Sequence, residues 1–176
     1  GRVTSLHDPD RGTTLSQYNG FGELTHSEDA LGRTVDLYYD SIGRLTSKID
    51  ADGLSAWIFD KNRLAEVWSP AGHKVLYSYD AAGRPFKTEK IIDGETFAIG
   101  QSYDAFSRIQ SIQYPNGFGI QREYDAYGHL QKIKQGAETL WQLLGADGAG
   151  RISYEQFGAE VTTLREYWQE KNRLKH

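Results

Sequence analysis

The sequence contains no cysteine and no methionine among its 176 residues. The absence of cysteine excludes a disulfide framework and any thiolate metal site. No run of about 18 apolar residues occurs, so the sequence predicts no membrane-spanning helix. The formal net charge of -4 argues against a nucleic-acid-binding protein, which normally carries a basic stripe. The missing initiator methionine and a truncated repeat near residue 168 lead us to expect a fragment of a longer repeat protein.

What the chain does contain is a repeated phrase, clearest at Tyr39-Asp40-Ser41-Ile42-Gly43-Arg44-Leu45. Eight copies, four of them degenerate, start near Tyr18, Tyr39, Phe59, Tyr79, Tyr103, Tyr124, Ala146 and Trp168. A fixed period of 20 to 24 residues is typical of a stacked array in which each unit packs on its neighbours. We therefore expect one repeat array over residues 1–176.

Each repeat carries two turn signals about ten residues apart. In the phrase itself, Asp can accept hydrogen bonds from nearby backbone N–H groups, and Gly three residues later can adopt a positive φ. This is the chemistry of a type I turn that closes into a bulge. The second signal is a dipeptide such as Asp52-Gly53 or Asp93-Gly94. Between turns the residues alternate with period two, as in Val75, Tyr77 and Tyr79, which indicates strands.

The predicted fold is therefore all-β, an antiparallel array of β-hairpins. Hydrophobic residues make up only 38% of the chain, which favours a thin sheet over a thick core. Residues 160–174 also fit a helical spacing, and residues 137–144 are similarly ambiguous. We expect strands in 160–174 because Trp168–Leu174 closely mimics Phe59–Leu64. Equivalent tyrosines are expected to form an aromatic ladder along the sheet.

The recurring polar residues are predicted to build turns. This structural set comprises Asp40, Gly43, Arg44, Asp80, Gly83, Arg84, Asp104, Arg108, Asp125, Gly128, Asp147, Gly150 and Arg151. A cation site is the alternative for the aspartates, but Ca²⁺ requires six to eight oxygens around one point. Each arginine is expected to pair with a neighbouring carboxylate or to stack on an adjacent tyrosine, and anionic cargo is the alternative partner.

No catalytic site, metal site or cofactor is predicted. His7 with Asp8 and Asp10 is the only compact cluster of metal-ligand types, and a solvated loop explains it. The glycines recur as turn residues and form no phosphate-binding loop. The tryptophans could stack on sugars, although aromatic packing across strands also explains them; they are Trp57, Trp68, Trp141 and Trp168.

The phrase Tyr-Asp-x-x-Gly-Arg-Leu at this period resembles the YD repeat of the RHS (rearrangement hotspot) family, over about Tyr18 to Leu174. The resemblance implies a curved β-ribbon that spirals into part of a hollow shell. In bacterial members, including the B and C subunits of insecticidal toxin complexes, the shell encloses a toxic C-terminal domain; in the more distantly similar teneurins it serves adhesion. The family's terminal cleavage segment is not present here, so autoproteolysis is not carried over.

The resemblance leads to a non-enzymatic hypothesis, a wall segment of a secreted or cell-surface bacterial shell. Its expected partners are neighbouring repeats of the parent shell and an enclosed toxin polypeptide, with edge-to-edge self-association of the fragment and no nucleic acid. The candidates for a polar lumen face are Gln110, Gln131 and Gln135. The alternative is a repeat module that binds carbohydrate or a cell-surface receptor.

Overall fold

A computed structural model describes residues 1–168 and 173–175 of the chain. They form two compact units, Gly1–Ala98 and Ile99–His176. The first contains β1 (Ser5–Asp8), β2 (Gly12–Tyr18), β3 (Leu24–Glu28), β4 (Thr34–Tyr39), β5 (Leu45–Asp50), β6 (Gly53–Asp60), β7 (Arg63–Trp68), β8 (Lys74–Tyr79) and β9 (Pro85–Ile92). β10 (Glu95–Tyr103) crosses the boundary, and the second unit continues with β11 (Ile109–Gln113), β12 (Gly119–Tyr124), β13 (Leu130–Gln135), β14 (Glu138–Ala146), β15 (Ile152–Phe157) and β16 (Val161–Leu164).

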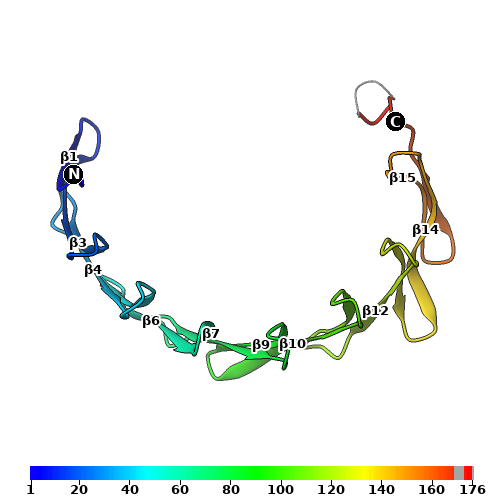
Figure 1. The fold of residues 1–176 in the computed structure, drawn as a ribbon, viewed down its shortest axis with the longest axis horizontal. Coiled ribbons are helices and arrows are strands. Elements are labelled where there is room, and N and C mark those ends of the chain that lie inside the picture. The colour runs from blue at the N-terminus through cyan, green and yellow to red at the C-terminus, as the bar shows by residue number, and fades with distance from the viewer. Residues whose placement is uncertain (169–172, 176) are drawn as a thin grey trace. The chain divides into compact units, whose positions relative to one another are not determined.

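Within each unit the strands pair antiparallel in chain order, so every hairpin lies beside the next one in sequence (Figure 1). The predicted all-β hairpin array is therefore confirmed, and no helix occurs among the described residues. Residues 137–144, ambiguous in sequence, lie mostly in β14. None of the described segments is a long apolar helix able to cross a membrane.

The sheet has almost no interior. No hydrophobic side chain is fully buried in the described part of the chain, and the one buried polar residue is Glu155, which is 4% exposed. A single layer leaves each strand with solvent on both faces, because no second layer covers either one. Stability must therefore come from contacts along the ribbon.

A β-bulge accompanies every described phrase. The strand register shifts by one residue just before the phrase's first residue, for example between Tyr38 and Tyr39. The same shift precedes Tyr18, Phe59, Tyr79, Tyr103, Tyr124 and Ala146. Bulges increase the local twist and bend a strand, so the repeat introduces the same bend at the same place each time. Gln110 and Gln131 are each the extra residue of such a bulge.

The turn of the phrase has one hydrogen-bonding pattern. The Gly43 N–H donates to the Asp40 carbonyl at 3.1 Å, and the Asp40 N–H donates to the Arg44 carbonyl at 2.9 Å. Gly43 has a φ of 82°. This is a type I turn followed by a residue in the left-handed region, where glycine fits at no steric cost. Ser107 takes the same place in its phrase with a φ of 64°.

One degenerate copy builds a different turn. From Phe59 to Leu64 the chain is one residue shorter than from Tyr39 to Leu45 and lacks the glycine. Asp60 pairs directly with Arg63, which leaves a two-residue loop with Lys61 at a φ of 54°. The shorter loop therefore still reverses the chain, but without the capping aspartate geometry of the full phrase.

The last copy lies partly outside the described residues, because the structure does not describe 169–172 or 176. Tyr167 pairs with Leu174 in an isolated antiparallel bridge. The strand expected within 160–174 is β16 (Val161–Leu164). Tyr167, one residue before the predicted start near Trp168, makes the contacts of a phrase tyrosine, as shown below.

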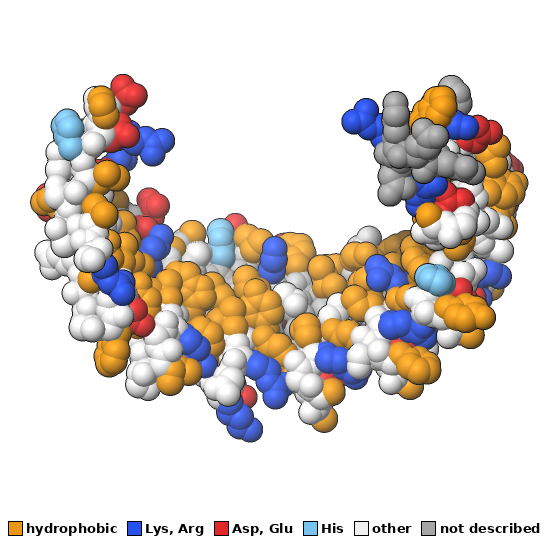
Figure 2. Space-filling view, turned by 45° about the horizontal axis from the view of Figure 1, so that its top comes forward, with side chains coloured by type: hydrophobic (Ala, Val, Ile, Leu, Met, Phe, Trp, Pro, Cys, Tyr) orange, Lys and Arg blue, Asp and Glu red, His pale blue; other side chains and the backbone are white. Residues whose placement is uncertain are grey.

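The two faces of the first unit differ in character. Because side chains alternate along each strand, Tyr39 and its equivalents share one side, here called the tyrosine face. The opposite face carries large hydrophobic side chains that are 41–54% exposed: Tyr38, Ile49, Leu54, Ile58 and Trp68. Figure 2 shows hydrophobic side chains spread among polar ones over the side of the molecule that it displays.

Candidate functional site

The aspartate of each full phrase is saturated within its own turn. The Asp40 Oδ1 atom accepts hydrogen bonds from the Ile42 and Arg44 backbone N–H groups, both at 3.0 Å. Its Oδ2 atom accepts one from the Arg44 Nε atom at 2.7 Å. Asp80, Asp104 and Asp147 bond to Arg84, Arg108 and Arg151 in the same way. In the phrase of Asp125, His129 replaces the arginine.

These contacts favour the ionised carboxylate. The hydrogen bond from the Arg84 side chain, followed by that from the Arg84 backbone, holds the pKa of Asp80 below its usual value. At Asp40 the backbone hydrogen bond from Arg44 is the largest cause of the lowered pKa. At Asp104 desolvation raises the pKa, but the hydrogen bonds from Arg108 outweigh it and the net shift is downward. No group of three His, Asp or Glu residues in the described parts of the chain could hold a metal ion.

The arginine of one phrase also contacts the aromatic ring of the next. The Arg44 guanidinium carbon lies 4.2 Å from the centre of the Phe59 ring, and the Arg44 Nη1 atom donates to the Lys61 carbonyl at 2.7 Å. Equivalent cation–π contacts join Arg2 to Tyr18, Arg63 to Tyr79, Arg108 to Tyr124 and Arg151 to Tyr167. Arg44, Arg108 and Arg151, which also bond to the aspartates of their own turns, thus bridge that turn and the following hairpin.

The tyrosine hydroxyl completes the joint. Tyr39 donates to the Leu24 carbonyl oxygen at 2.9 Å, fifteen residues earlier. The same bond over the same interval joins Tyr18 to Val3, Tyr79 to Leu64, Tyr124 to Ile109 and Tyr167 to Ile152. We call this set of contacts, from aspartate through arginine to the next aromatic ring and its carbonyl acceptor, the phrase joint.

The ring–ring contacts of Tyr114 with Phe118 and of Tyr127 with His129 each lie within one turn and do not build the expected tyrosine ladder. Equivalent tyrosines stand two strands apart, about 10 Å at a strand spacing near 4.8 Å. That distance is too long for direct ring contact. Where an arginine is present, its guanidinium contacts the ring of the following phrase, as Arg108 contacts Tyr124.

Two variants of the turn pair escaped sequence reasoning. Asp29 and Arg33 make the same bidentate turn, with Arg33 Nε 2.6 Å from Asp29 Oδ2. The motif Asp-x-x-Gly-Arg was present there, but Glu28 precedes it where the search required tyrosine. Asn19 replaces the aspartate and donates to Glu23 at the arginine position, so the hydrogen bond survives with its direction reversed.

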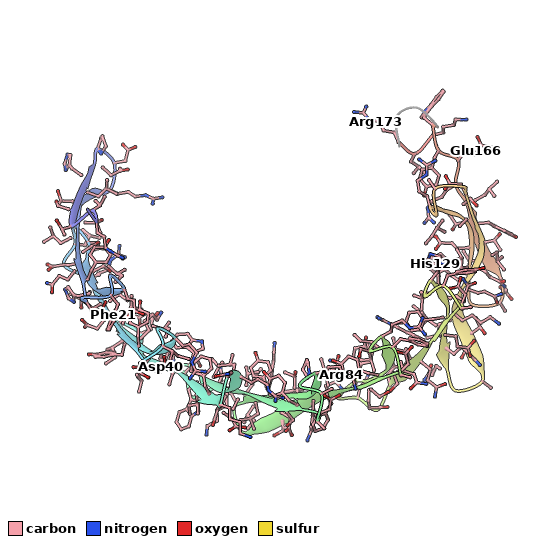
Figure 3. All side chains as sticks on the ribbon, viewed as in Figure 1. Phe21, Asp40, Arg84, His129, Glu166 and Arg173 are labelled. Carbon is pink, nitrogen blue, oxygen red and sulfur yellow. The ribbon has the colours of Figure 1, made fainter. Side chains whose placement is uncertain are left out.

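A row of exposed apolar side chains at the turn tips was also missed. The third residue after the first tyrosine of the phrase lies at the tip of the turn in four phrases, where it is 67–89% exposed: Phe21, Ile42, Phe106 and Tyr127. Figure 3 labels Phe21 and, at other turns, Asp40, Arg84 and His129. An apolar residue before the turn glycine, repeated in several copies, was the available signal.

The four tryptophans do not share one environment. Trp57 and Trp141 are half-buried, whereas Trp68 and Trp168 are 41% and 56% exposed. The Trp141 Nε1 atom donates to Glu155 Oε2 at 2.7 Å, and Arg165 forms an ion pair with the other oxygen of Glu155. Lys74 Nζ lies 3.8 Å from the centre of the Trp68 ring and covers part of it. Trp141 is thus engaged in a polar cluster on the sheet.

The cluster at His7 is occupied by local hydrogen bonds. The His7 Nδ1 atom lies 3.1 Å from Thr13 Oγ1, across the first hairpin. Asp8 Oδ1 accepts from the backbone N–H groups of Asp10 and Arg11, both at 2.9 Å. The carboxylate of Asp8 therefore organises a turn.

Solved structures share this fold at low sequence identity. A TcdB2-TccC3 crystal structure matches with a TM-score of 0.81 and 17% identity, covering 99% of this chain and 11% of that chain. TcdB2-TccC3-TEV gives 0.77 and 17%, covering 97% and 10%. The Photorhabdus luminescens Tc holotoxin pore gives 0.72 and 17%, covering 99% and 10%. The chain thus spans about a tenth of the length of these neighbours.

No curated relative matches the sequence. The family model described as RHS Repeat matches residues 18–55 and 60–98. Both matched stretches contain the phrase turn and the strands that flank it. Residues 18–55 and 60–98 are therefore similar to RHS repeats, as the recurring tyrosine–aspartate phrase predicts.

Proposed function

We propose that this segment is a structural part of a wall that encloses a toxic polypeptide for secretion or delivery. The observation that carries the proposal is the single-layer ribbon: strands pair continuously within each unit, while no described hydrophobic side chain is fully buried. Such a ribbon provides area and a barrier, and phrase aspartates such as Asp40 and Asp104 are bonded within their own turns. The similarity in fold to structures of Tc toxin components supports the same role.

The phrase joint strengthens the connection between successive hairpins of the proposed wall. Ordinary strand pairing joins neighbouring strands, whereas the joint adds a cation–π contact and a hydrogen bond between successive hairpins. In a ribbon without a core, such repeated contacts keep successive hairpins from separating, since each repeat contacts only its neighbours.

The exposed turn tips fit the same proposal. Phe21 and Ile42 in the first unit, and Phe106 and Tyr127 in the second, present apolar side chains where one hairpin ends. Exposed apolar side chains in a row mark surfaces that other protein covers. We assign them to contacts with neighbouring repeats of the parent shell.

Limited proteolysis of the full-length parent tests enclosure. The enclosed polypeptide is expected to resist digestion in the wild-type shell and to be cut when Tyr79→Ala and Tyr124→Ala open two phrase joints. Tyr38→Ala and Tyr154→Ala, which lie outside both the joints and the turn tips, are the matched controls and should leave protection intact. Digestion of the polypeptide in the wild-type shell as fast as outside any shell would refute the container role.

Carbohydrate or receptor binding is the second candidate, and the exposed ring of Trp68 is the observation that favours it. Trp141 is a poorer sugar platform because its indole N–H is committed to Glu155. Glycan-array binding that disappears on Trp68→Ala but persists on Trp141→Phe would support this function over the wall alone.

A further inference from the structure

One phrase joint in the second unit lacks both of its partners. Where other phrases start with an aromatic residue, this one starts with Ala146, and the preceding phrase has His129 in place of arginine. The contact that Arg108 makes with Tyr124, and that Arg151 makes with Tyr167, therefore has no counterpart between these two repeats.

The place of the missing pair is open. A groove of about 770 Å³ lies there, and both replaced residues line it. Leu130 and Ile152, which follow the two turns, contribute further walls, and Trp141 is the aromatic side chain that lines it. The groove thus lies between the two residues that replace the arginine and the aromatic ring. β14 carries a second register shift, between Leu143 and Gly145, so Ala146 follows Leu130 by one residue more than in the complete joints.

The hydrogen-bond acceptor for that ring is also in place. In the complete joints the tyrosine hydroxyl donates to the carbonyl of the residue opposite the previous phrase's first residue, as with Ile109 opposite Tyr103. Leu130 stands opposite Tyr124 in the same register. In the described part of the chain no tyrosine hydroxyl donates to the Leu130 carbonyl, whose counterpart Ile152 receives one from Tyr167.

The walls of the groove are held by local contacts. The Asp125 Oδ2 atom is 3.2 Å from both the His129 Nδ1 atom and the Gln131 Nε2 atom. The indole N–H of Trp141 is fixed on Glu155. Figure 3 labels His129 at the turn that borders the groove. A preformed slot of this kind binds a ring without first having to order its own walls.

We propose that this groove is a binding slot for a tyrosine side chain of a partner polypeptide, which completes the joint that Ala146 leaves open. The ring lies between His129 and Ile152, and its hydroxyl donates to the Leu130 carbonyl. An apolar slot left by a missing side chain binds a matching small molecule when its shape is retained. The assignment is independent of the container proposal.

The test is a titration of the 176-residue chain with p-cresol, the tyrosine side chain, followed by the amide shifts of Gln131 and Ala146. Saturable binding is expected, about three- to tenfold tighter than that of toluene, which lacks the hydroxyl. N-acetyl-tyrosinamide is expected to bind at least as tightly as p-cresol, since a polypeptide must enter with its backbone attached.

Two variants make the test specific. Ala146→Tyr supplies the ring from within, so p-cresol binding should be lost and the melting temperature should rise; Ala146→Ser should keep binding. Tyr167→Ala empties the neighbouring joint and should create a second p-cresol site. Absence of p-cresol binding to the wild type, equal affinity for toluene, exclusion of N-acetyl-tyrosinamide, or binding unchanged by Ala146→Tyr would each overturn the assignment. Because enclosure is tested on the full-length parent, the two failures are distinguishable.

Discussion

Arg108 lies over the ring of Tyr124 with its guanidinium carbon 4.4 Å from the ring centre, and so joins two successive hairpins. The same guanidinium is bonded to Asp104 by the Nε atom at 2.6 Å. The Tyr124 hydroxyl, in turn, donates to the Ile109 carbonyl at 2.8 Å. In a sheet without a buried core, these contacts hold successive hairpins together, as a hydrophobic interior does in domains with two layers.

Tyr124 should therefore contribute to stability in two separable parts. Tyr124→Phe removes the hydroxyl bond and is expected to cost about 0.5–1.5 kcal/mol. Tyr124→Ala also removes the ring from Arg108 and is expected to cost about 2–3 kcal/mol. Urea unfolding measures both. Tyr127→Ala, whose ring is 88% exposed in the same phrase, is the control and should stay within about 0.5 kcal/mol of wild type.

The lowered aspartate pKa values predict acid sensitivity. A carboxyl whose folded pKa lies below its unfolded value near 3.9 stabilises the fold above that value, and this stabilisation is lost as pH falls through the folded pKa. For Asp80, whose pKa is lowered by Arg84, Asp80→Asn should reduce the melting temperature at pH 6. The wild-type and variant curves should converge as the pH falls through the lowered pKa of Asp80. A difference that persists unchanged after the carboxyl is protonated would contradict this.

Sequence reasoning could predict the hairpin array because the turn residues are local. Asp40 and Gly43 define their turn within five residues, so the same chemistry acts wherever the phrase occurs. The alternation of apolar and polar residues with period two then predicts strands between the turns. The shortened copy at Phe59 shows the limit, because one missing residue changes the loop while the strand pairing on both sides persists.

The phrase joint could be predicted only in part. Sequence offers both partners for each arginine, its own aspartate and a neighbouring ring, and the structure shows that Arg44 contacts both. The hydrogen bond from Tyr39 to the Leu24 carbonyl joins β4 to β3 and depends on the bulge before Tyr39. No single residue of the sequence predicts that bulge. The ion pair of the buried Glu155 with Arg165 likewise depends on the register of β15 with β16, which pairs Tyr154 with Leu164.

Gly43 should resist substitution for two reasons. Its φ is 82°, and a Cβ atom there would lie 2.6 Å from Glu23 Oε1. Gly43→Ala is expected to cost about 1–2 kcal/mol, and Gly43→Val more, because branched side chains disfavour positive φ. Gly148→Ala is the control, since a Cβ there meets nothing within 4 Å and its φ is not positive. An unchanged melting temperature for Gly43→Val would contradict the turn assignment.

Replacement of Arg165, the ion-pair partner of Glu155, is expected to lower the stability of the fold strongly. The carboxylate is 4% exposed and is compensated by Arg165 and the Trp141 indole. Arg165→Met leaves a buried charge with only one donor and is expected to cost about 2–4 kcal/mol in urea unfolding. Lys134→Met removes an ion pair with the exposed Glu123 and should cost less than about 1 kcal/mol. Equal costs for the two variants would show that Glu155 does not depend on its cation.

The outer edge of β1 should make the chain associate with itself. β1 pairs with β2 alone among the described strands of its unit, so one row of its backbone N–H and C=O groups is open to another strand. Light scattering is expected to show oligomers whose mass rises with concentration. Leu6→Lys, at 60% exposure in β1, should reduce the mass because charge disfavours edge pairing. Leu144→Lys adds the same charge in β14, which is paired on both sides, and should leave the mass unchanged. A monomer at every concentration, before any substitution, would show that the edge of β1 is not a pairing surface.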